Sequence, residues 1–389
     1  MSLPVIQLDH QASTPCEAAV LEAMAPWWSE HFANPSSRLH HPGLEAAAAL
    51  EVARASLAGQ LGVPPEAVVF TSGATEANNL ALKGLAEAEL LAGGSRRHLI
   101  TLATEHRAVL DPLRYLARLG FALTELPVQP DGLVDLAQLE EAFRPETLLV
   151  SVMAANNEIG VLQPLAAIGE LCRQRGVAFH CDGAQAVGHI PLQPRPLGID
   201  LLSLSGHKLY GPKGIGALVL ASELPLAAQL HGGSQERGLR AGTPALPLVV
   251  GLARALELAQ ADQAERSLRL AALRDRLWRG LEALGDVQRN GAAAPRLAHN
   301  LNVTISGVDG GALHSALRQQ LAVSSGSACS SGEPSHVLKA LGRSRVEAAA
   351  SIRFGLGRHS QPADIDQAIA AVAAAMAKLR HSETDFIKT

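Results

Sequence analysis

Helix-length and strand-length apolar segments alternate between residue 43 and about residue 225 of this 389-residue chain. This alternation predicts an α/β domain in which helices cover both faces of a mostly parallel sheet. Most of the strand segments are separated by roughly the 10 to 15 residues that a crossover helix occupies. We therefore expect the carboxyl ends of the strands to meet at one edge of the sheet. The expected strands are AVVF, HLITL, FALTEL, TLLVSVM, VAFHCD, DLLSLS and IGALVL.

A second and smaller domain is expected beyond the first. The residues from Pro244 to Leu284 contain few helix breakers, and this helical stretch is expected to link the two domains. After it come a strand, a helix, a Ser/Gly-rich turn, a second strand and an Ala-rich final helix, which is typical of an α+β domain. We expect a large α/β domain over residues 1–257, with an N-terminal arm at 1–16 that packs on the small domain, and a small domain over 258–389.

Composition and charge exclude several classes of function. The formal net charge of −4 and a pI near 6.4 predict no basic surface for nucleic acid or anionic lipid. Charged residues interrupt every apolar run before the roughly 18 residues of a membrane-spanning helix, and the N-terminus resembles no signal sequence. The four cysteines form no paired motif and the 15 histidines are scattered, so neither disulfides nor a bound metal is expected. We expect a cytoplasmic protein.

Lys208 stands in a glycine-rich segment, SGHKLYGPKGIG, directly after an expected strand. Only six of the 33 basic residues are lysines, so a lysine in this compact segment suits a role that arginine cannot fill. Lysine can lose its proton and form a Schiff base with an aldehyde, whereas arginine stays protonated. The alternative is an exposed lysine on a turn.

Two further segments place polar groups at strand ends. In HCDGAQAVG a strand delivers Asp182 to its carboxyl end, where a carboxylate can hold the protonated nitrogen of a pyridine ring. In FTSGATEANN the first amides of a helix, with the hydroxyls of Thr71, Ser72 and Thr75, can bind a phosphate. Helix capping alone would explain either segment. Combined with Lys208, however, the two segments supply partners for the nitrogen, phosphate and aldehyde of pyridoxal phosphate.

These segments belong to a longer series of motifs: LDHQASTP, NPSSRLHHPG, FTSGATEANN, TEHRAVL, MAANNEIGVLQP, HCDGAQAVG, SGHKLYGPKGIG, GGSQERGLRAGTP, AVSSGSACSSG and SIRFGLGR. In this series, which covers nearly the whole chain, the sequence resembles the cysteine desulfurases, pyridoxal-phosphate enzymes of the class V aminotransferase group. The resemblance implies fold type I, with a mixed, mostly parallel seven-stranded sheet in the large domain. It also implies a homodimer whose active sites lie at the subunit interface.

The resemblance assigns roles to individual residues. Lys208 would be the Schiff-base lysine, Asp182 the partner of the ring nitrogen, and Gln185 a hydrogen-bond donor to the ring hydroxyl. His106 would stack on the pyridine ring. The residues expected to hold the phosphate are Thr75, the amide of Ala74, Ser205, His207 and, reaching the phosphate of the other subunit, Thr243.

The substrate's carboxylate would be held by Asn157 and Arg353. For Arg353 this expectation also follows from chemistry, because a guanidinium pairs with a carboxylate through two parallel hydrogen bonds. The implied reaction converts L-cysteine to L-alanine, with Lys208 moving the α-proton and His106 helping to deprotonate the thiol of Cys329. Sulfane sulfur would remain on Cys329 as a persulfide, for delivery to an iron–sulfur scaffold or another acceptor protein.

The surroundings of the cysteines also favour Cys329. It lies in SSGSACSSG, where Ser and Gly predict a mobile and exposed loop, whereas Cys172 falls on a helical pattern and Cys181 on a strand. Cys16, beside a proline, is interpreted as structural. The stretch after Cys329 is a few residues shorter than in long-loop members of the family, which predicts a shorter reach for the thiol.

Several alternatives stay open. Selenocysteine lyase, cystine C–S lyase and an aminotransferase share the expected fold, although an aminotransferase needs no cysteine in a mobile loop. A non-catalytic sulfur scaffold would require the loss of Lys208 or Asp182, and both are present. His10 and Gln11 stand where family members more often have Asn and Ala, and we expect this departure to matter little.

Overall fold

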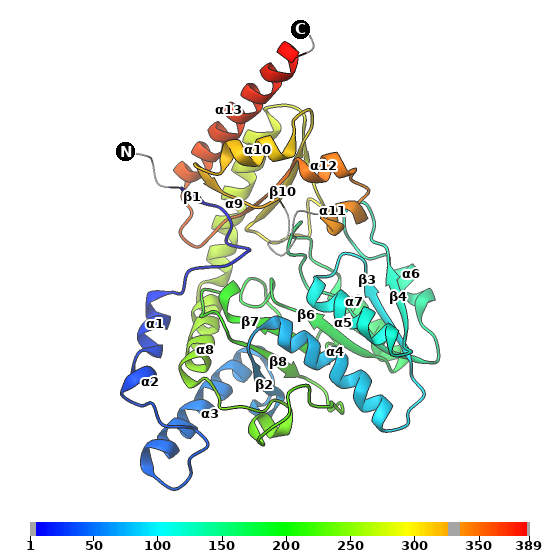
Figure 1. Ribbon diagram of the computed structural model, residues 1–389, viewed down its shortest axis with the longest axis vertical. Helices are drawn as coiled ribbons and strands as arrows, with labels where there is room; N and C mark the ends of the chain where they lie inside the picture. Colours follow the sequence, from blue (N-terminus) through cyan, green and yellow to red (C-terminus); the bar gives the residue numbers. More distant parts are fainter. Residues whose placement is uncertain (1–4, 326–334, 387–389) are drawn as a thin grey trace.

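The computed structural model describes residues 5–325 and 335–386, and the chain forms a large and a small layered part (Figure 1). A sheet surrounded by helices makes up the large part, and the final helix runs along the outside of the small part. Residues 326–334 include Cys329, so the predicted sulfur-accepting thiol lies outside the described residues.

A seven-stranded sheet forms the centre of the large part, in the order β2-β8-β7-β6-β5-β3-β4. Neighbouring strands are parallel except at β8, which is antiparallel to both β2 and β7. The expected mixed, mostly parallel sheet is confirmed. Every strand segment expected from the sequence is present: β2 (Val68–Thr71), β3 (His98–Leu102), β4 (Ala122–Leu126), β5 (Thr147–Ser151), β6 (Ala178–Asp182), β7 (Leu201–Ser205) and β8 (Gly216–Leu220).

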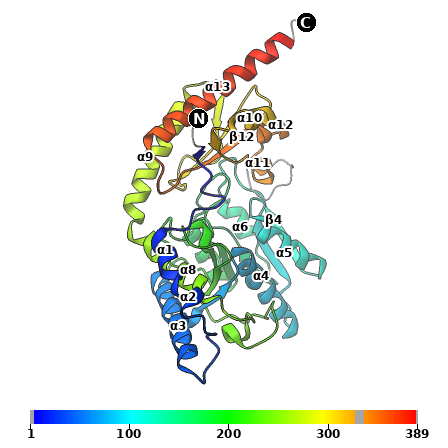
Figure 2. The ribbon, with the colours of Figure 1, turned by 60° about the vertical axis from the view of Figure 1, so that its left-hand side comes forward.

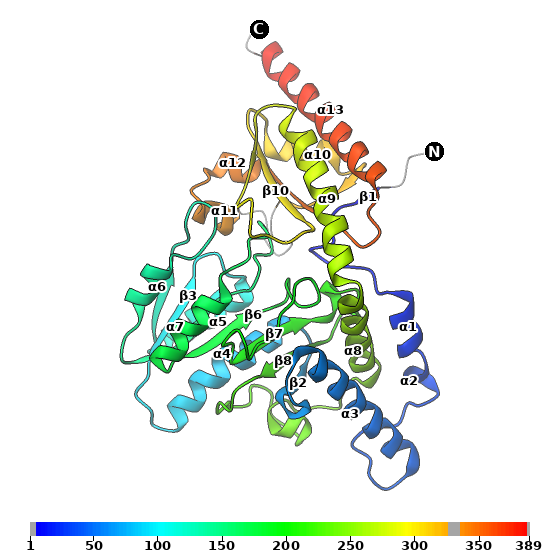
Figure 3. The same ribbon diagram turned by 180° about the vertical axis from the view of Figure 1, so that it is seen from behind.

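Helices cover both faces of this sheet (Figure 3). On one face α3, α7 and α8 bury Leu57, Ile168 and Leu252 against the strands, and on the other face α4 and α5 bury Leu80 and Leu113. The helices and short 3-10 turns of this part are α1 (Ala18–Met24), α2 (Pro26–Ser29), α3 (His41–Leu61), η1 (Pro65–Ala67), α4 (Ala74–Leu91), α5 (Arg107–Arg118), α6 (Leu136–Ala142), α7 (Leu165–Arg175), η2 (Gly206–Lys208), η3 (Gln235–Gly238) and α8 (Leu246–Ala261).

The longest of these helices, α3, shows how local sequence sets its ends. His40 caps the first turn, because its side chain accepts a hydrogen bond from the amide of Gly43 at 3.1 Å. Pro42 occupies the first turn, where its missing N–H costs no helical hydrogen bond. The helix ends at Gly62, whose φ of 66° lies in the left-handed region that glycine adopts without strain.

The helical stretch expected between the two parts is divided into α8 and α9 (Gln263–Glu282), which meet at Asp262. The buried side chain of Arg266 donates to the carbonyl of Ala259 at 2.7 Å, which satisfies a carbonyl at the end of α8. Figure 2 shows α9 leaving the large part beside α8 and running along the small part. Ala259 still packs in the large core and Leu270 in the small one. The boundary after residue 257 stays a prediction.

The small part contains an antiparallel sheet in the order β12-β10-β9, packed against α9, α10 and α13. The N-terminal segment reaches it, since β1 pairs in parallel with β11. No helix within residues 5–325 and 335–386 has both the length and the apolarity to cross a membrane. The elements are β1 (Ile6–Gln7), β9 (Val287–Arg289), β10 (Asn300–Ile305), α10 (Gly310–Leu317), β11 (Leu321–Ala322), α11 (His336–Ala340), α12 (Arg345–Ala349), β12 (Ser351–Gly355) and α13 (Pro362–Phe386).

Candidate active site

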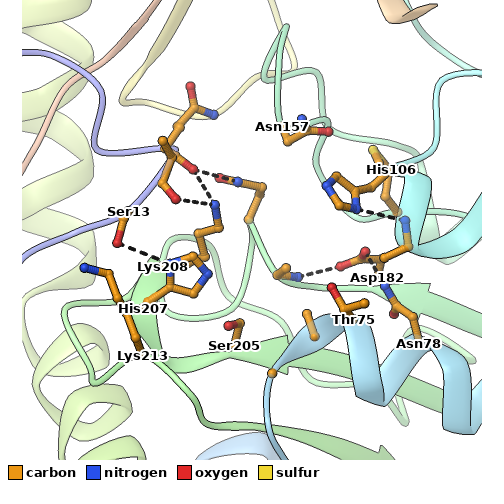
Figure 4. A pocket seen from close by; sticks show the side chains of 18 of the residues that line it. Ser13, Thr75, Asn78, His106, Asn157, Asp182, Ser205, His207, Lys208 and Lys213 are labelled. Carbon is orange, nitrogen blue, oxygen red and sulfur yellow. Dashed lines mark hydrogen bonds between the residues drawn. The ribbon is translucent and has the colours of Figure 1, made fainter. Parts of the chain in front are cut away.

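A cavity of about 460 Å³ lies at the carboxyl edge of the large sheet. Strands β6 and β7 end there at Asp182 and Ser205, and Arg353 of the small part lines the same space. Figure 4 shows Lys208 and His207 near one another, and Asp182, Thr75 and His106 grouped apart from them. The structure brings together ten of the predicted site residues: Ala74, Thr75, His106, Asn157, Asp182, Gln185, Ser205, His207, Lys208 and Arg353.

The N-terminus of α4 borders the cavity without a side-chain cap. Gly73, the residue before the helix, has φ 154° and ψ 179°, a conformation that residues with a Cβ rarely adopt. The amides of Ala74 and Thr75 begin the helix, so they belong to the first-turn N–H groups that have no partner within it. Such amides, with the positive end of the helix dipole, favour an anion.

Ser205 and His207 also line the cavity, and a Cβ placed on Gly73 would lie 3.8 Å from Oγ of Ser205. Nδ1 of His207 lies 3.3 Å from Oγ of Ser13. Burial, together with the positive charges of Lys208 and Lys213, lowers the pKa of His207 to about 4. The ring is therefore neutral at pH 7, which leaves one N–H to donate to an anion.

Asp182 is held by two hydrogen bonds from protein N–H groups. The side-chain amide of Asn78 donates to its Oδ2 at 2.8 Å, and the amide of Ala184 donates to its Oδ1 at 2.9 Å. These donors fix the plane of the carboxylate, and Asn78 and Ala184 line the cavity together with Asp182. Sequence reasoning missed Asn78, which lies on α4 in the very segment singled out for phosphate binding.

His106 is the residue before α5 and caps that helix. Its Nδ1 accepts a hydrogen bond from the amide of Ala108 at 3.1 Å, so the neutral ring carries its proton on Nε2. Burial lowers the pKa of His106, the positive charge of Lys208 adds to that effect, and the carboxylate of Asp182 opposes it. In this arrangement His106 is a neutral donor at Nε2. It can take the proton of a thiol only if its bond to Ala108 is broken.

Lys208 follows β7, and its ammonium contacts the N-terminal segment. Its Nζ donates to the carbonyl of Gln11 at 2.6 Å and to that of Ala12 at 2.9 Å. Gln185 donates from Nε2 to the same Gln11 carbonyl at 3.1 Å. The N-terminal segment therefore lies directly against two of the predicted cofactor-binding residues, a contact that the sequence alone did not predict.

Arg353 is only 2% exposed and lies on β12. Its Nη1 donates to the carbonyl of Asn157 at 2.9 Å and its Nη2 donates to Asp9 at 2.7 Å. A guanidinium has five N–H groups, so these two bonds hold it in place and leave others for a carboxylate. Asp9 was not expected from the sequence, because it stands far from Arg353 along the chain.

Two predicted site residues do not line this cavity among the described parts of the chain. Thr243 is exposed, beyond η3. Its role toward the other subunit stays a prediction. Cys329 lies outside the described residues, but the chain before that segment contacts Arg353 of the cavity, and the chain after it contacts Glu105, the neighbour of His106. The amide of Arg353 donates to the carbonyl of Ser324 at 2.7 Å, and Nε2 of His336 lies 2.9 Å from the carbonyl of Glu105.

The other three cysteines are poorly suited to nucleophilic chemistry. Burial raises the pKa of the Cys172 thiol to about 12 and raises the pKa of Cys181 well above its usual range. Burial also raises the pKa of Cys16, and the neighbouring Glu17 carboxylate adds to that effect. A thiol that stays protonated at pH 7 is a weak nucleophile. Within the described residues, His, Cys, Asp and Glu side chains form no group that could hold a metal ion.

The cavity residues fit pyridoxal phosphate. An uncapped helix start and a neutral His207 suit the phosphate, a carboxylate held at both oxygens suits a protonated ring nitrogen, and Lys208 suits an aldehyde. Several buried polar atoms of cavity residues also have no hydrogen-bond partner, as expected where a polar ligand binds. These atoms are Oδ1 of Asn78, Oδ1 of Asn157, Nε2 of Gln11 and Nε of Arg353.

Comparisons with known proteins agree with this geometry. The family model for class-V aminotransferases matches residues 6–368. The chain is 47% identical to "Cysteine desulfurase IscS" of Dechloromonas aromatica (strain RCB), over 98% of this chain and 94% of that protein. Among solved structures, a "NifS-like protein" is 34% identical with a TM-score of 0.90, covering 97% and 100% of the two chains. "SspA in complex with cysteine" is 38% identical with a TM-score of 0.79, covering 91% and 99%.

The sheet topology and the residues around its carboxyl edge define a fold type I enzyme of the pyridoxal-phosphate-dependent class. More narrowly, the chain belongs to the class-V aminotransferase family and, within that family, to the cysteine desulfurases.

Proposed function

We propose that this protein is a cysteine desulfurase that converts L-cysteine to L-alanine and retains the sulfur on Cys329. The observation that carries the proposal is a single cavity in which Lys208, Asp182 and Arg353 meet. The relatives named cysteine desulfurase match nearly the whole chain, and a similar structure is titled as a complex with cysteine.

The cofactor of this reaction is proposed to be pyridoxal phosphate, which supplies an aldehyde and a pyridine ring that takes up electrons from the substrate's Cα. Asp182, fixed by Asn78, would hold the ring nitrogen, and Gln185 would donate to the ring hydroxyl. His106 would cover the face of the ring. The phosphate would be bound by the amide of Ala74 with Thr75, Ser205 and His207, and by Thr243 of a second copy of the chain.

Substrate orientation falls to Arg353 and Asn157. Arg353 is held by Asp9 and by the Asn157 carbonyl, so it can donate to a carboxylate without reorganising. Asn157 has an unpartnered side-chain oxygen inside the cavity, and rotation of its amide would present an N–H instead. Lys208 would take the proton from the substrate's Cα with its Nζ and return a proton at Cβ.

Sulfur transfer is assigned to Cys329. Its thiolate would attack Sγ of the substrate, so an S–S bond forms and the Cβ–Sγ bond breaks, with the electron pair passing to Cβ. Protonation at Cβ and the return of a proton to Cα complete L-alanine, and Cys329 keeps the sulfur as a persulfide. The balance is one cysteine and one thiol giving one alanine and one persulfide, so no external oxidant is needed.

Sulfur then passes to an acceptor protein, for which an iron–sulfur scaffold is our proposal. We further propose that the enzyme acts as a cytoplasmic homodimer. Support for the dimer comes from Thr243, which is exposed although the family resemblance makes it a phosphate ligand. The segment before Thr243 is anchored by Glu236, whose buried carboxylate accepts two hydrogen bonds of 2.8 Å from the buried guanidinium of Arg54.

The proposed function is tested by supplying L-cysteine to the purified protein with pyridoxal phosphate and a reductant. Stoichiometric L-alanine and sulfide are expected from the wild type. A keto acid in place of alanine would identify an aminotransferase, and turnover of selenocysteine but not cysteine would identify a selenocysteine lyase. Pyruvate and persulfide from cystine would identify a C–S lyase.

A further inference from the structure

The side-chain amide of Gln11 is a polar group of the cavity to which the proposed reaction gives no role. Gln11 is only 1% exposed and lines the cavity, and its backbone carbonyl accepts bonds from Lys208 and Gln185. Its side-chain Nε2 is buried without a hydrogen-bond partner. A buried donor without an acceptor is unfavourable, so one inside a ligand cavity is expected to meet an acceptor on the ligand.

The surrounding network fixes which end of the Gln11 amide is unpaired. Nη2 of Arg296 can only donate, and it contacts Oδ1 of Asn300 at 2.8 Å. Nδ2 of Asn300 therefore faces the other way, where it donates to the carbonyl of Glu158 at 3.0 Å and to Oε1 of Gln11 at 2.6 Å. The oxygen of Gln11 is thereby paired with Asn300, and the NH₂ group is the end that lacks a partner.

Gln11 lies beside the guanidinium that is proposed to bind the substrate's carboxylate. Asp9, two residues before it, accepts from Nη2 of Arg353 at 2.7 Å. The backbone of Gln11 packs closely on β12, because a Cβ placed on Gly355 would be 2.8 Å from the backbone nitrogen of Gln11. Gly355 is two residues from Arg353, so the two residues lie on the same face of the strand. Nε of Arg353 also lacks a partner. Two buried donors without acceptors therefore share one end of the cavity.

We propose that Nε2 of Gln11 is a further donor, beside Arg353, to the α-carboxylate of the amino-acid substrate. A carboxylate has roughly four lone-pair positions that can accept hydrogen bonds, and a bidentate arginine occupies two of them. A neutral amide N–H can therefore donate to one of the positions that remain. Gln11 would thus favour α-amino acids over amines that lack the carboxylate. The inference rests on the proposed function, since it concerns the same cavity and the same class of substrate.

The test compares L-alanine with ethylamine, which differ only in the carboxylate. Each is titrated into the cofactor-loaded enzyme, and its dissociation constant is read from the change in cofactor absorbance. Gln11→Ala is expected to weaken L-alanine binding about tenfold, the loss of one hydrogen bond to a charged group, and to change ethylamine binding by less than about twofold. Gln11→Glu keeps an acceptor for Asn300 but replaces the donor by a negative charge, so a larger loss of L-alanine binding is expected.

The controls separate recognition from support of the fold. Gln60 also has a buried side-chain atom without a partner, but this residue lies outside the cavity. The variant Gln60→Ala should therefore bind L-alanine and ethylamine as the wild type does. Equal weakening of L-alanine and ethylamine by Gln11→Ala, or wild-type L-alanine binding by Gln11→Glu, would overturn the inference. Failure of the proposed function is seen separately, as a wild-type enzyme that forms no alanine from L-cysteine.

Discussion

At the scale of single residues, the proposed chemistry depends on polar side chains that are held by specific partners. Asp182 and Arg353 each have two protein partners that leave the side facing the cavity available. The sequence identified both residues but not their partners. Asn78 lies 104 residues from Asp182 and Asp9 lies 344 residues from Arg353, and no local pattern reveals such pairs.

Lys208→Ala should abolish the formation of alanine, because no other group at this position is assigned to move the substrate's Cα proton. A loss of at least about 100-fold in kcat is expected, in line with the contribution of a general acid–base group. Alanine is measured by chromatography after incubation with L-cysteine. Lys83→Ala, a lysine of α4 that lies over the ring of Tyr115, should retain wild-type activity. Comparable rates in Lys208→Ala and the wild type would refute the assignment.

Asn78→Ala should weaken the binding of pyridoxal phosphate by about tenfold, because Asp182 loses a charge-assisted hydrogen bond. The affinity is measured by titrating the cofactor into the cofactor-free protein and following its absorbance. Asn79→Ala is the matched control, since that exposed amide bonds only within its own helix, to the carbonyl of Thr75 at 2.9 Å. The role given to Asn78 would be wrong if both variants bound the cofactor equally well.

At the scale of elements, the large sheet was predictable because each of its strands is a short apolar run between helical segments. The short strands β1, β9 and β11 were not expected, since two or three residues carry no periodic signal. The interruption at Asp262 was also missed. A side chain from the next helix, Arg266, satisfies the end of α8 there, and tertiary contacts of this kind override helix propensity.

The segment around η3 depends on one buried ion pair. Glu236 has φ 45°, and its carboxylate accepts from Arg54 and, at 2.8 Å, from the amide of Phe70. Glu236→Ala leaves Arg54 buried without its main partner, so the free energy of unfolding should fall by about 3–5 kcal/mol. Urea denaturation measures the change. Glu51, an exposed partner of the same arginine, is the control, and Glu51→Ala should cost less than about 1 kcal/mol. An equal loss of stability in Glu236→Ala and Glu51→Ala would contradict the greater importance given to the buried ion pair.

At the scale of the whole molecule, stability should fall in acid because several histidines are buried in the neutral form. Burial lowers the pKa of His98, His180 and His189 to about 4, from a usual value of 6.5. Between these pKa values the unfolded chain binds protons that the folded chain does not. The contribution of these histidines to the free energy of unfolding is therefore fully present above pH 6.5 and is lost as the pH falls toward 4.

Thermal unfolding at several pH values tests this account. The Tm should decrease steadily from pH 7 to pH 4.5, and the decrease should be shallower in His180→Asn. His180 is fully buried between Oγ of Ser151 and Oγ of Ser203, at 2.8 and 3.0 Å. A Tm that is independent of pH over this range would be inconsistent with buried neutral histidines.

The dimer can be tested by complementation between two inactive or weakened variants. If Thr243 serves the active site of the other subunit, a mixed dimer of Lys208→Ala and Thr243→Ala contains one site with both native residues. The two variants are unfolded, mixed and refolded together, and activity above the sum of the separately refolded parents is expected. Activity equal to that sum would place Thr243 and Lys208 in the same subunit's site.

Sulfur from L-cysteine is proposed to remain on Cys329, so the decisive measurement is to locate that sulfur. The cofactor-loaded enzyme is exposed to L-cysteine without reductant, alkylated, digested and analysed by mass spectrometry. We expect one additional sulfur on the peptide that contains Cys329, with Cys16, Cys172 and Cys181 unmodified. We also expect no alanine from Cys329→Ser. Extra sulfur on one of the other three cysteines, or undiminished alanine formation by Cys329→Ser, would contradict the assignment to Cys329.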